Sequence, residues 1–302
     1  MPGTSTKAHI GAQCHLRLCK EEQWGELPGS PDWVCCPLWA EGYGVALNTP
    51  PSVPDVNMGG FQRRHMLPLV RQLSGGLRTG LYRYQAEFLL QAALSRNESW
   101  DVESLTAQHY SPVQVREHNG LVIANMRLMG DAESGRLVAW FQLLGKHEEG
   151  LTEGAPCPSD FVYPDEPPYA YQHGVVQLPE GTVLGRAQAF SIDVNNHMIV
   201  GPSGSDYEIV FAKAGRRSVG GWVRLVYESE TYEDGAREFE ESSLVLDFAH
   251  PLGGTGGSME IILKHLWLEA ASAAGNAGGL VRQTLRFQAR GTDSDDDMEV
   301  TF

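Results

Sequence analysis

The chain has 302 residues, of which 42% are hydrophobic, and this is enough for a buried core and excludes a disordered protein. Its 38 acidic and 23 basic residues give a formal charge of −15, which argues against a conventional DNA-binding protein, because such proteins use lysines and arginines to displace counterions from phosphates. Thirty-four glycines and seventeen prolines between short apolar runs indicate many turns, so a mainly β fold is expected.

The N-terminal region shows no targeting pattern. Residues 1–13 (MPGTSTKAHIGAQ) lack the consecutive apolar residues of a signal peptide, and no run of about eighteen apolar residues suggests a membrane span. We therefore expect a protein that contacts no membrane and folds in a cytosol.

Five cysteines are expected to be free thiols, because a cytosol is reducing. They are Cys14, Cys19, Cys35, Cys36 and Cys157. Four residues separate Cys14 from Cys19, and Cys35 and Cys36 form a doublet where a zinc site would use Cys-x-x-Cys. We expect neither a metal nor a cofactor.

The first half predicts a strand, a helix and a hairpin in that order. LSGGLRTGLYRYQAEF runs from a glycine pair into an aromatic-rich strand, and QAEFLLQAALS follows with helical periodicity. The apolar face of this helix contains Phe88, Leu89, Ala92 and Ala93, and Ser95 and Asn97 end it. VQVREHNGLVIANMRLMG and DAESGRLVAWFQLLGK then predict two antiparallel strands.

Residues 147–185 break this periodicity with acidic residues, prolines and glycines, which indicates a linker or an arm between two halves. The aromatic residues of this stretch are Phe161, Tyr163, Tyr169 and Tyr171. They favour an arm that packs on the protein, and a solvated loop is the alternative.

The second half predicts a similar set of strands. In VGGWVRLVYES, Val223, Leu225 and Tyr227 alternate with polar or mixed residues, which is typical of a half-buried strand. EFEESSLVLDFAH predicts a strand from about Ser243, or a short helix over 237–241 that leads into one. MEIILKHLWLEAASAAG and NAGGLVRQTLRFQARG then repeat the hairpin pattern of the first half. We therefore expect two tandem domains, 1–146 and 186–302, joined by 147–185.

No catalytic motif is convincing. GPSGS at 201–205 lacks the Gly-x-Ser-x-Gly order of a nucleophile turn, and GGTGG at 253–257 lacks the lysine of a phosphate-binding loop. His197 and His265 lie in predicted strands and are expected to be packed or surface side chains. The acidic residues between 233 and 241 are expected to form a solvated face, so no enzyme activity is predicted.

Several stretches of the chain resemble the two-domain class of bacteriophage tail tube proteins, in which the tube domain is duplicated. They are PLVRQLSGGLRTGLYRYQAEFLLQAALS, the strand pair from Val113 to Lys146, FSIDVNNHMI, GRRSVGGWVRLVYES and the strand pair from Met259 to Gly291. The resemblance implies a mainly β fold of two tandem β-sandwich or barrel domains of antiparallel strands, each with at most a short flanking helix.

The resemblance also implies a structural virion protein, not an enzyme, which self-assembles into stacked rings that form the conduit for DNA ejection. A two-domain chain would form trimeric rings with pseudo-sixfold symmetry, in which sheets join across subunits. The implied partners are other copies of the chain, tail terminator, distal tail or baseplate proteins and the tape measure protein, with DNA as transient cargo. The implied location is the virion tail, after assembly in the bacterial host cytoplasm.

Acidic residues that face such a channel would keep DNA from adhering. The candidates on polar faces of predicted strands are Glu228, Glu230, Asp247, Glu260 and Glu269, and an outer-surface position is the alternative for each. The final TDSDDDMEVTF would form a solvated acidic tail, or add Met298, Val300 and Phe302 to a neighbour's sheet edge.

Two other functions stay open. A terminator, an adaptor or the inner tube of an injection system would be a related structural protein, and a terminator would stop at one ring. A carbohydrate-binding or carbohydrate-active β-sandwich would be monomeric, with a row of exposed aromatic residues on one sheet face. Trp140, Trp222 and Trp267 lie in predicted strands, where we expect them to pack in the core.

Overall fold

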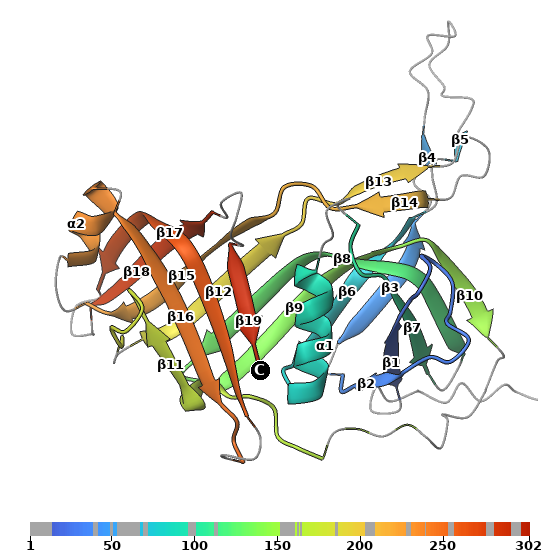
Figure 1. The fold of residues 1–302 in the computed structure, drawn as a ribbon, viewed down its shortest axis with the longest axis horizontal. Helices are drawn as coiled ribbons and strands as arrows, with labels where there is room; N and C mark the ends of the chain where they lie inside the picture. Colours follow the sequence, from blue (N-terminus) through green and yellow to red (C-terminus); the bar gives the residue numbers. More distant parts are fainter. Residues whose placement is uncertain are drawn as a thin grey trace, which may run out of the picture.

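Antiparallel strands make up most of the molecule in the computed structural model (Figure 1). The structure describes residues 14–302 except for 39–41, 49–50, 53–66, 69–71, 96–100, 112–113, 152–160, 162, 164, 185–186, 203–208, 228–230, 239, 253–256, 276–280 and 291–296. The described part contains strands, two short α-helices and one 3-10 turn, which confirms the predicted mainly β fold. No helix in it is long and apolar enough to cross a membrane.

Eight strands pair edge to edge in one continuous sheet, which we call the central sheet. In spatial order they are β3 (Tyr43–Asn48), β6 (Gln72–Gly80), β9 (Arg136–Gly145), β8 (Val115–Asp131), β12 (Ala187–Asn195), β15 (Ser218–Val226), β18 (Arg282–Ala289) and β17 (Ser258–Ala274). The first four come from the first half of the chain and the last four from the second half.

Two smaller sheets lie on one side of the central sheet. β8 and β17 belong to both layers, because only their C-terminal parts pair within the central sheet, while their N-terminal parts pair with other strands. In the first half these strands are β1 (His15–Lys20), β2 (Val34–Cys36), β7 (Leu105–Tyr110) and β10 (His147–Leu151). In the second half they are β11 (Gly174–Gln177), β16 (Glu241–Ala249) and β19 (Met298–Thr301).

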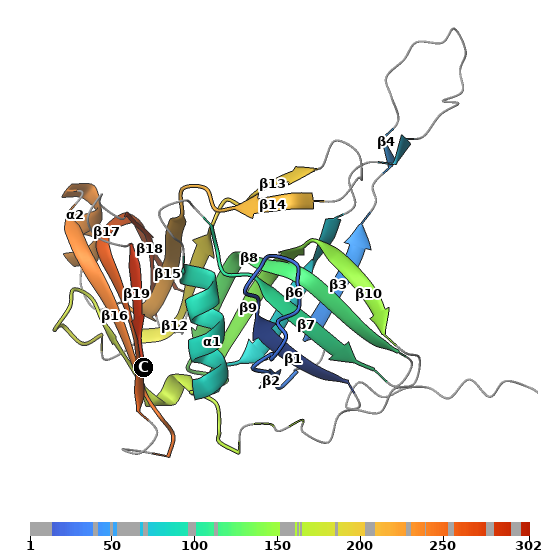
Figure 2. The same cartoon turned by 45° about the vertical axis from the view of Figure 1, so that its right-hand side comes forward.

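Two helices and two short hairpins complete the described fold. They are α1 (Arg83–Leu94), α2 (Thr231–Glu238), β4 (Pro51–Ser52) with β5 (Leu67–Pro68), and β13 (Ile199–Pro202) with β14 (Ile209–Lys213). The 3-10 turn η2 spans Tyr171–His173. Figures 1 and 2 show both hairpins extending beyond the same end of the central sheet.

The two halves have the same order of strand pairing. β6, α1, β7, β8, β9 and β10 correspond in sequence order and partners to β15, α2, β16, β17, β18 and β19. β3 pairs with β6 as β12 pairs with β15, and a hairpin connects the two strands of each pair. The hairpin pattern that recurs in the sequence therefore reflects a repeated strand topology.

The hydrophobic core lies between the central sheet and the smaller sheets. Phe141 and Phe287 face it from β9 and β18, and Leu16 and Phe248 face it from the smaller sheets. In Figure 1, α1 crosses this side of the central sheet between the two smaller sheets. Leu89, which is fully buried, lies on its inner face.

The predicted helix is confirmed as α1, which begins at Arg83 and ends at Leu94. Its predicted apolar face is also confirmed, because three of its four residues are buried and Phe88 packs partly buried against the core. The second helix begins before the expected 237–241 range and overlaps it only at 237–238; it spans Thr231–Glu238 and contains no buried residue. The strand after it begins at Glu241 rather than Ser243.

The aromatic residues of the 147–185 stretch pack on the protein. Phe161 and Tyr163 lie against His15, and the Tyr163 hydroxyl is 2.7 Å from the His15 Nδ1. Tyr169 is buried with its ring edge-on to His250, and Tyr171 stacks on Phe190. The same stretch contributes β10 and β11 to the smaller sheets.

Candidate assembly interface and channel face

The junction between β8 and β12 joins the two halves into one sheet. Seven residue pairs form it, from Asn125 opposite Asn195 to Asp131 opposite Ala189. Arg127 and Asp193 lie directly opposite each other in this ladder and form an ion pair. Backbone hydrogen bonds thus make one half an extension of the other.

The central sheet has an unpaired strand at each end. Among the described residues, β3 pairs only with β6, and β17 beyond Trp267 pairs only with β18. Unpaired edges offer rows of backbone donors and acceptors, so a folded protein covers them or uses them for association. The β17 edge reads AASAA over 270–274.

These two edges match the two strands of the internal junction. β3 has the place in the first half that β12 has in the second, and the C-terminal part of β17 has the place of the same part of β8. The irregularity in each strand gives the alignment, because it follows Ile123 opposite Leu143 in β8 and Leu268 opposite Phe287 in β17. The free edge of β17 therefore corresponds to the edge of β8 that pairs with β12, and the free edge of β3 corresponds to the edge of β12 that pairs with β8.

The glycine pairs seen in the sequence allow close approach of these strands. A Cβ atom on Gly75 of β6 would lie 1.9 Å from the Gly44 carbonyl oxygen of β3. A Cβ atom on Gly221 of β15 would lie 2.0 Å from the Ser191 carbonyl oxygen of β12. Only glycine avoids both collisions, so the pairs set the backbone spacing at equivalent positions.

The face of the central sheet that points away from the core is called here the open face. Because successive side chains of a strand point to opposite faces, the residues next to the buried ones lie on the open face. They include Arg78, Trp140, Trp222 and Arg286. Arg78 lies directly opposite Trp140, and Trp222 directly opposite Arg286. Each half thus has one arginine–tryptophan pair across equivalent strands, with the two residue types exchanged between the strands and the pairs offset by two residues.

The three tryptophans are not core residues, although their places in predicted strands had led us to expect core packing. Trp140 is 37% exposed, and Trp222 and Trp267 are partly exposed on the same open face. The expectation was wrong because apolar content alone does not reveal which face of a strand meets the core. In RQTLRFQAR the alternation itself was visible, since Arg282 and Arg286 share a face opposite to Leu285 and Phe287.

Three of the five candidate channel carboxylates lie in the described part of the chain. Asp247 of β16 and Glu260 of β17 are direct cross-strand partners in the smaller sheet of the second half, on the face opposite to the core. Glu269 is exposed at an irregularity of β17, between Leu268 and Ala270. Glu228 and Glu230 lie outside the described residues.

The C-terminal strand is held by the chain itself. β19 pairs with β17, with Leu263 opposite Met298. Lys264 Nζ lies 3.0 Å from Glu299 Oε2, and Asp297 at the start of the strand is buried. The expected addition to a neighbour's sheet is therefore wrong for 298–301, which complete a sheet of their own chain.

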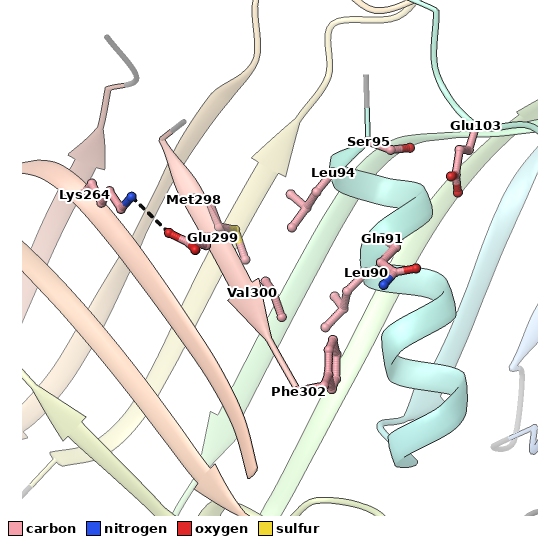
Figure 3. Close-up of a pocket in the computed structure, with 10 residues that line it drawn as sticks. All are labelled: Leu90, Gln91, Leu94, Ser95, Glu103, Lys264, Met298, Glu299, Val300 and Phe302. Atoms are coloured by element: carbon pink, nitrogen blue, oxygen red, sulfur yellow. Dashed lines mark ion pairs between the residues drawn. The ribbon is translucent and has the colours of Figure 1, made fainter. Parts of the chain in front are cut away.

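A groove of about 680 Å³ separates β19 from α1. Leu90 and Leu94 of the helix face Val300 and Phe302 across it (Figure 3). Next to the start of β19, Arg217 is buried, donates from Nε to Asn196 Oδ1 at 3.1 Å, and lies with Nη1 3.7 Å from Asp297 Oδ1. This contact fastens the C-terminal strand to the junction between the halves.

Cysteine, histidine and acidic side chains do not form a catalytic or metal-binding site in the described part of the chain. Cys14, Cys19, Cys35 and Cys36 are free thiols there, and Cys157 lies outside it. Burial raises the pKa of the Cys19 thiol to about 12, which keeps it protonated and unreactive. No group of three or more His, Cys, Asp or Glu residues in the described ranges could hold a metal ion. His197 and His265 both have positive φ and lie on the surface or half-buried.

Comparison with protein families identifies the family of the chain. A family model described as phage tail tube protein matches residues 11–289. The chain belongs to the phage tail tube protein family. The match spans both halves and the junction between them, and it assigns this tail tube protein a structural role in the virion tail. No curated protein matches the chain.

Proposed function

We propose that three copies of this tail tube protein close into a ring, and that the rings stack into the conduit through which phage DNA leaves. The supporting observation is the correspondence between the two free edges and the two strands of the internal junction. β17 of one copy would pair with β3 of the next, as β8 pairs with β12 within the chain. Six repeats per ring then give pseudo-sixfold symmetry.

The internal junction supplies the register of this contact. Met126 faces Val194 in the β8–β12 ladder, and the corresponding residues at the free edges are Ala271 and Leu47. Gly44 occupies the place of Ser191, and a Cβ atom there would meet nothing within 4 Å. The contact would therefore be made mainly by backbone hydrogen bonds.

The open face would line the channel. Closing the sheet into a barrel puts one face inside, and the core face already carries α1 and the two smaller sheets, which need the larger space outside. The hairpins β4–β5 and β13–β14 extend beyond one end of the sheet from equivalent connections, so they would contact the next ring in the stack (Figure 1).

The remaining partners follow from this role. Tail terminator and distal tail or baseplate proteins would meet the two ends of the stack, the tape measure protein and later DNA would occupy the channel, and assembly would take place in the host cytoplasm. The exposed tryptophans also fit a carbohydrate-binding sandwich, but that protein would stay monomeric, so assembly distinguishes the two functions.

Edge-blocking variants test ring closure. Arg78 donates its backbone N–H to the Gly42 carbonyl, so by alternation the amides of Tyr43, Val45 and Leu47 point to the free edge of β3. Leu47→Pro removes one of these donors and leaves the β3–β6 ladder intact. The same alternation from the Arg290 N–H to the His265 carbonyl directs the amide of Ala273 to the free edge of β17, so Ala273→Pro blocks the other side.

In negative-stain electron microscopy, we expect rings and tubes of the wild-type protein with threefold or pseudo-sixfold end views, and none of either variant. Mixing the two variants provides the control for folding, because each has one intact edge. Light scattering after size-exclusion chromatography should show monomers for each variant alone and a two-chain complex for the mixture. Tubes formed by both single variants would contradict the proposed edge contact.

A further inference from the structure

The open face of the central sheet is strongly basic, although the whole chain is acidic. Among the described strand residues this face has six arginines and two aspartates, a net charge of +4 from six minus two. These are Arg78, Arg127, Arg136, Arg224, Arg282 and Arg286, with Asp131 and Asp193. The rest of the chain then has −19, since the total is −15.

Both aspartates have local partners. Asp193 is the ion-pair partner of Arg127. Asp131 accepts backbone N–H bonds from Glu133 and Ser134 at 3.2 and 3.0 Å in the β8–β9 turn. Beside the sheet, Arg290 lies over the Trp267 ring at 5.6 Å and Glu269 is exposed, so these two residues add one charge of each sign. The excess of arginine therefore remains.

The arginines lie in rows across the strands. Arg78 of β6, Trp140 of β9 and Arg127 of β8 are successive cross-strand neighbours, and Trp222 and Arg286 continue the pattern in the second half. A hollow of about 530 Å³ lies beside the first row, lined by Gly44, Gly76, Arg78, Arg127, Met129 and Trp140. Gly44 and Gly76 leave room there for a ligand group that the guanidinium groups of Arg78 and Arg127 can both approach.

Because salt screens distant charges, the charge of the open face itself determines which ligands it attracts. At an ionic strength of 0.1 M charges interact over about 10 Å, so a ligand on the open face senses mainly this face and little of the acidic outer layer. Arg78, Arg136, Arg282 and Arg286 are exposed to solvent. Guanidinium groups bind phosphate through paired hydrogen bonds, and exposed contacts exchange quickly.

We infer that the open face of the central sheet binds the phosphate backbone of duplex DNA through Arg78 and Arg286 and the arginines around them. This rests on the proposed function, in which the open face lines the channel. On this inference, DNA in the channel makes weak, salt-dependent contacts with arginines instead of being repelled by acidic residues. Phosphates of the passing DNA release their counterions as they contact the arginines of one ring after another.

The test uses the unassembled full-length chain and a fluorescently labelled duplex of about 20 base pairs, followed by anisotropy from low to moderate salt. Binding should weaken with rising salt for the wild type. Arg78→Gln with Arg286→Gln should weaken binding at low salt by at least about tenfold and reduce the salt slope by about 2, since two phosphate contacts are lost. Lys20→Gln with Arg237→Gln removes the same charge from other exposed positions and should change affinity less than about twofold.

Three results would overturn the inference: no binding of the duplex by the wild type at low salt, equal weakening by both double variants, or tighter binding of poly-L-glutamate than of the duplex. Electron microscopy of the same samples separates this from the proposed function. Tubes formed by wild type that binds no duplex would reject the inference and leave ring closure intact, and tubes formed by Arg78→Gln with Arg286→Gln would show that this variant folds.

Discussion

At the scale of single residues, glycine positions decide how closely strands approach. Gly75 of β6 lies opposite Val45 of β3, and Gly44 lies opposite Gly76; of Gly75 and Gly44, only Gly75 is crowded by the partner backbone. Gly75→Ala should lower the free energy of unfolding by about 1–3 kcal/mol, as for other overpacked sites, because backbone must move. Gly44→Ala is the matched control and should stay within about 0.5 kcal/mol. Chemical denaturation measures both, and equal effects would contradict the close approach.

His118 makes the stability of the smaller first-half sheet depend on pH. Burial, with His109 and Arg116 nearby, lowers the pKa of His118 to about 4, despite Glu148 Oε2 at 3.6 Å from its Nε2. The ring is 1% exposed, and the Tyr43 hydroxyl is 2.7 Å from Nδ1.

Between pH 6.5 and 4 the unfolded chain therefore binds more protons at this residue than the folded chain, so stability rises with pH and falls on acidification. The slope from this residue is at most about 1.4 kcal/mol per pH unit. Urea midpoints across this range should fall less steeply for His118→Gln than for the wild type. Parallel curves would show that His118 does not cause the loss.

At the scale of elements, a buried polar contact fastens α1, the internal junction and β19 together. Asn196 donates from Nδ2 to the Ala93 and Ile123 carbonyl oxygens at 2.9 and 3.0 Å, and its Oδ1 accepts from Arg217. Asn196→Ala leaves these groups without their partner and should cost about 2–4 kcal/mol, since each unsatisfied buried group costs about 1–3. Asn195→Ala, at the neighbouring partly exposed position, should cost less. Equal losses in chemical denaturation would contradict the role of Asn196.

Sequence patterns correctly predicted helices and strands whose type and buried face depend only on their own residues. The apolar face of α1 and the alternation of Val223 and Leu225 in β15 are properties of short segments, and both are confirmed. β19 was not foreseen as an intrachain strand, because MEVT pairs with β17, a segment whose position depends on the whole fold. The open face was missed for the same reason, since a strand's alternation gives two faces without saying which meets the core.

At the scale of the whole molecule, the repeated hairpin pattern indicated a repeated topology, and the family match confirms the resemblance. The sequence could not reveal the continuous central sheet, because the β8–β12 pairing joins segments about sixty residues apart with no shared local pattern. The carboxylate candidates show the same limit, since Asp247 and Glu260 belong to a smaller sheet that only the tertiary fold separates from the central one.

The covalent connection between the two halves changes how closure of the proposed ring would depend on concentration. Of the six seams in a ring of three such chains, three would already be made when each chain folds, so the equilibrium amount of rings would rise with the third power of the subunit concentration rather than the sixth. A dilute pool of subunits would therefore reach complete rings at concentrations where six separate domains would remain mostly open fragments. The two repeats are also free to diverge, as the exchanged Arg78–Trp140 and Trp222–Arg286 pairs show, because each always has the other as its neighbour.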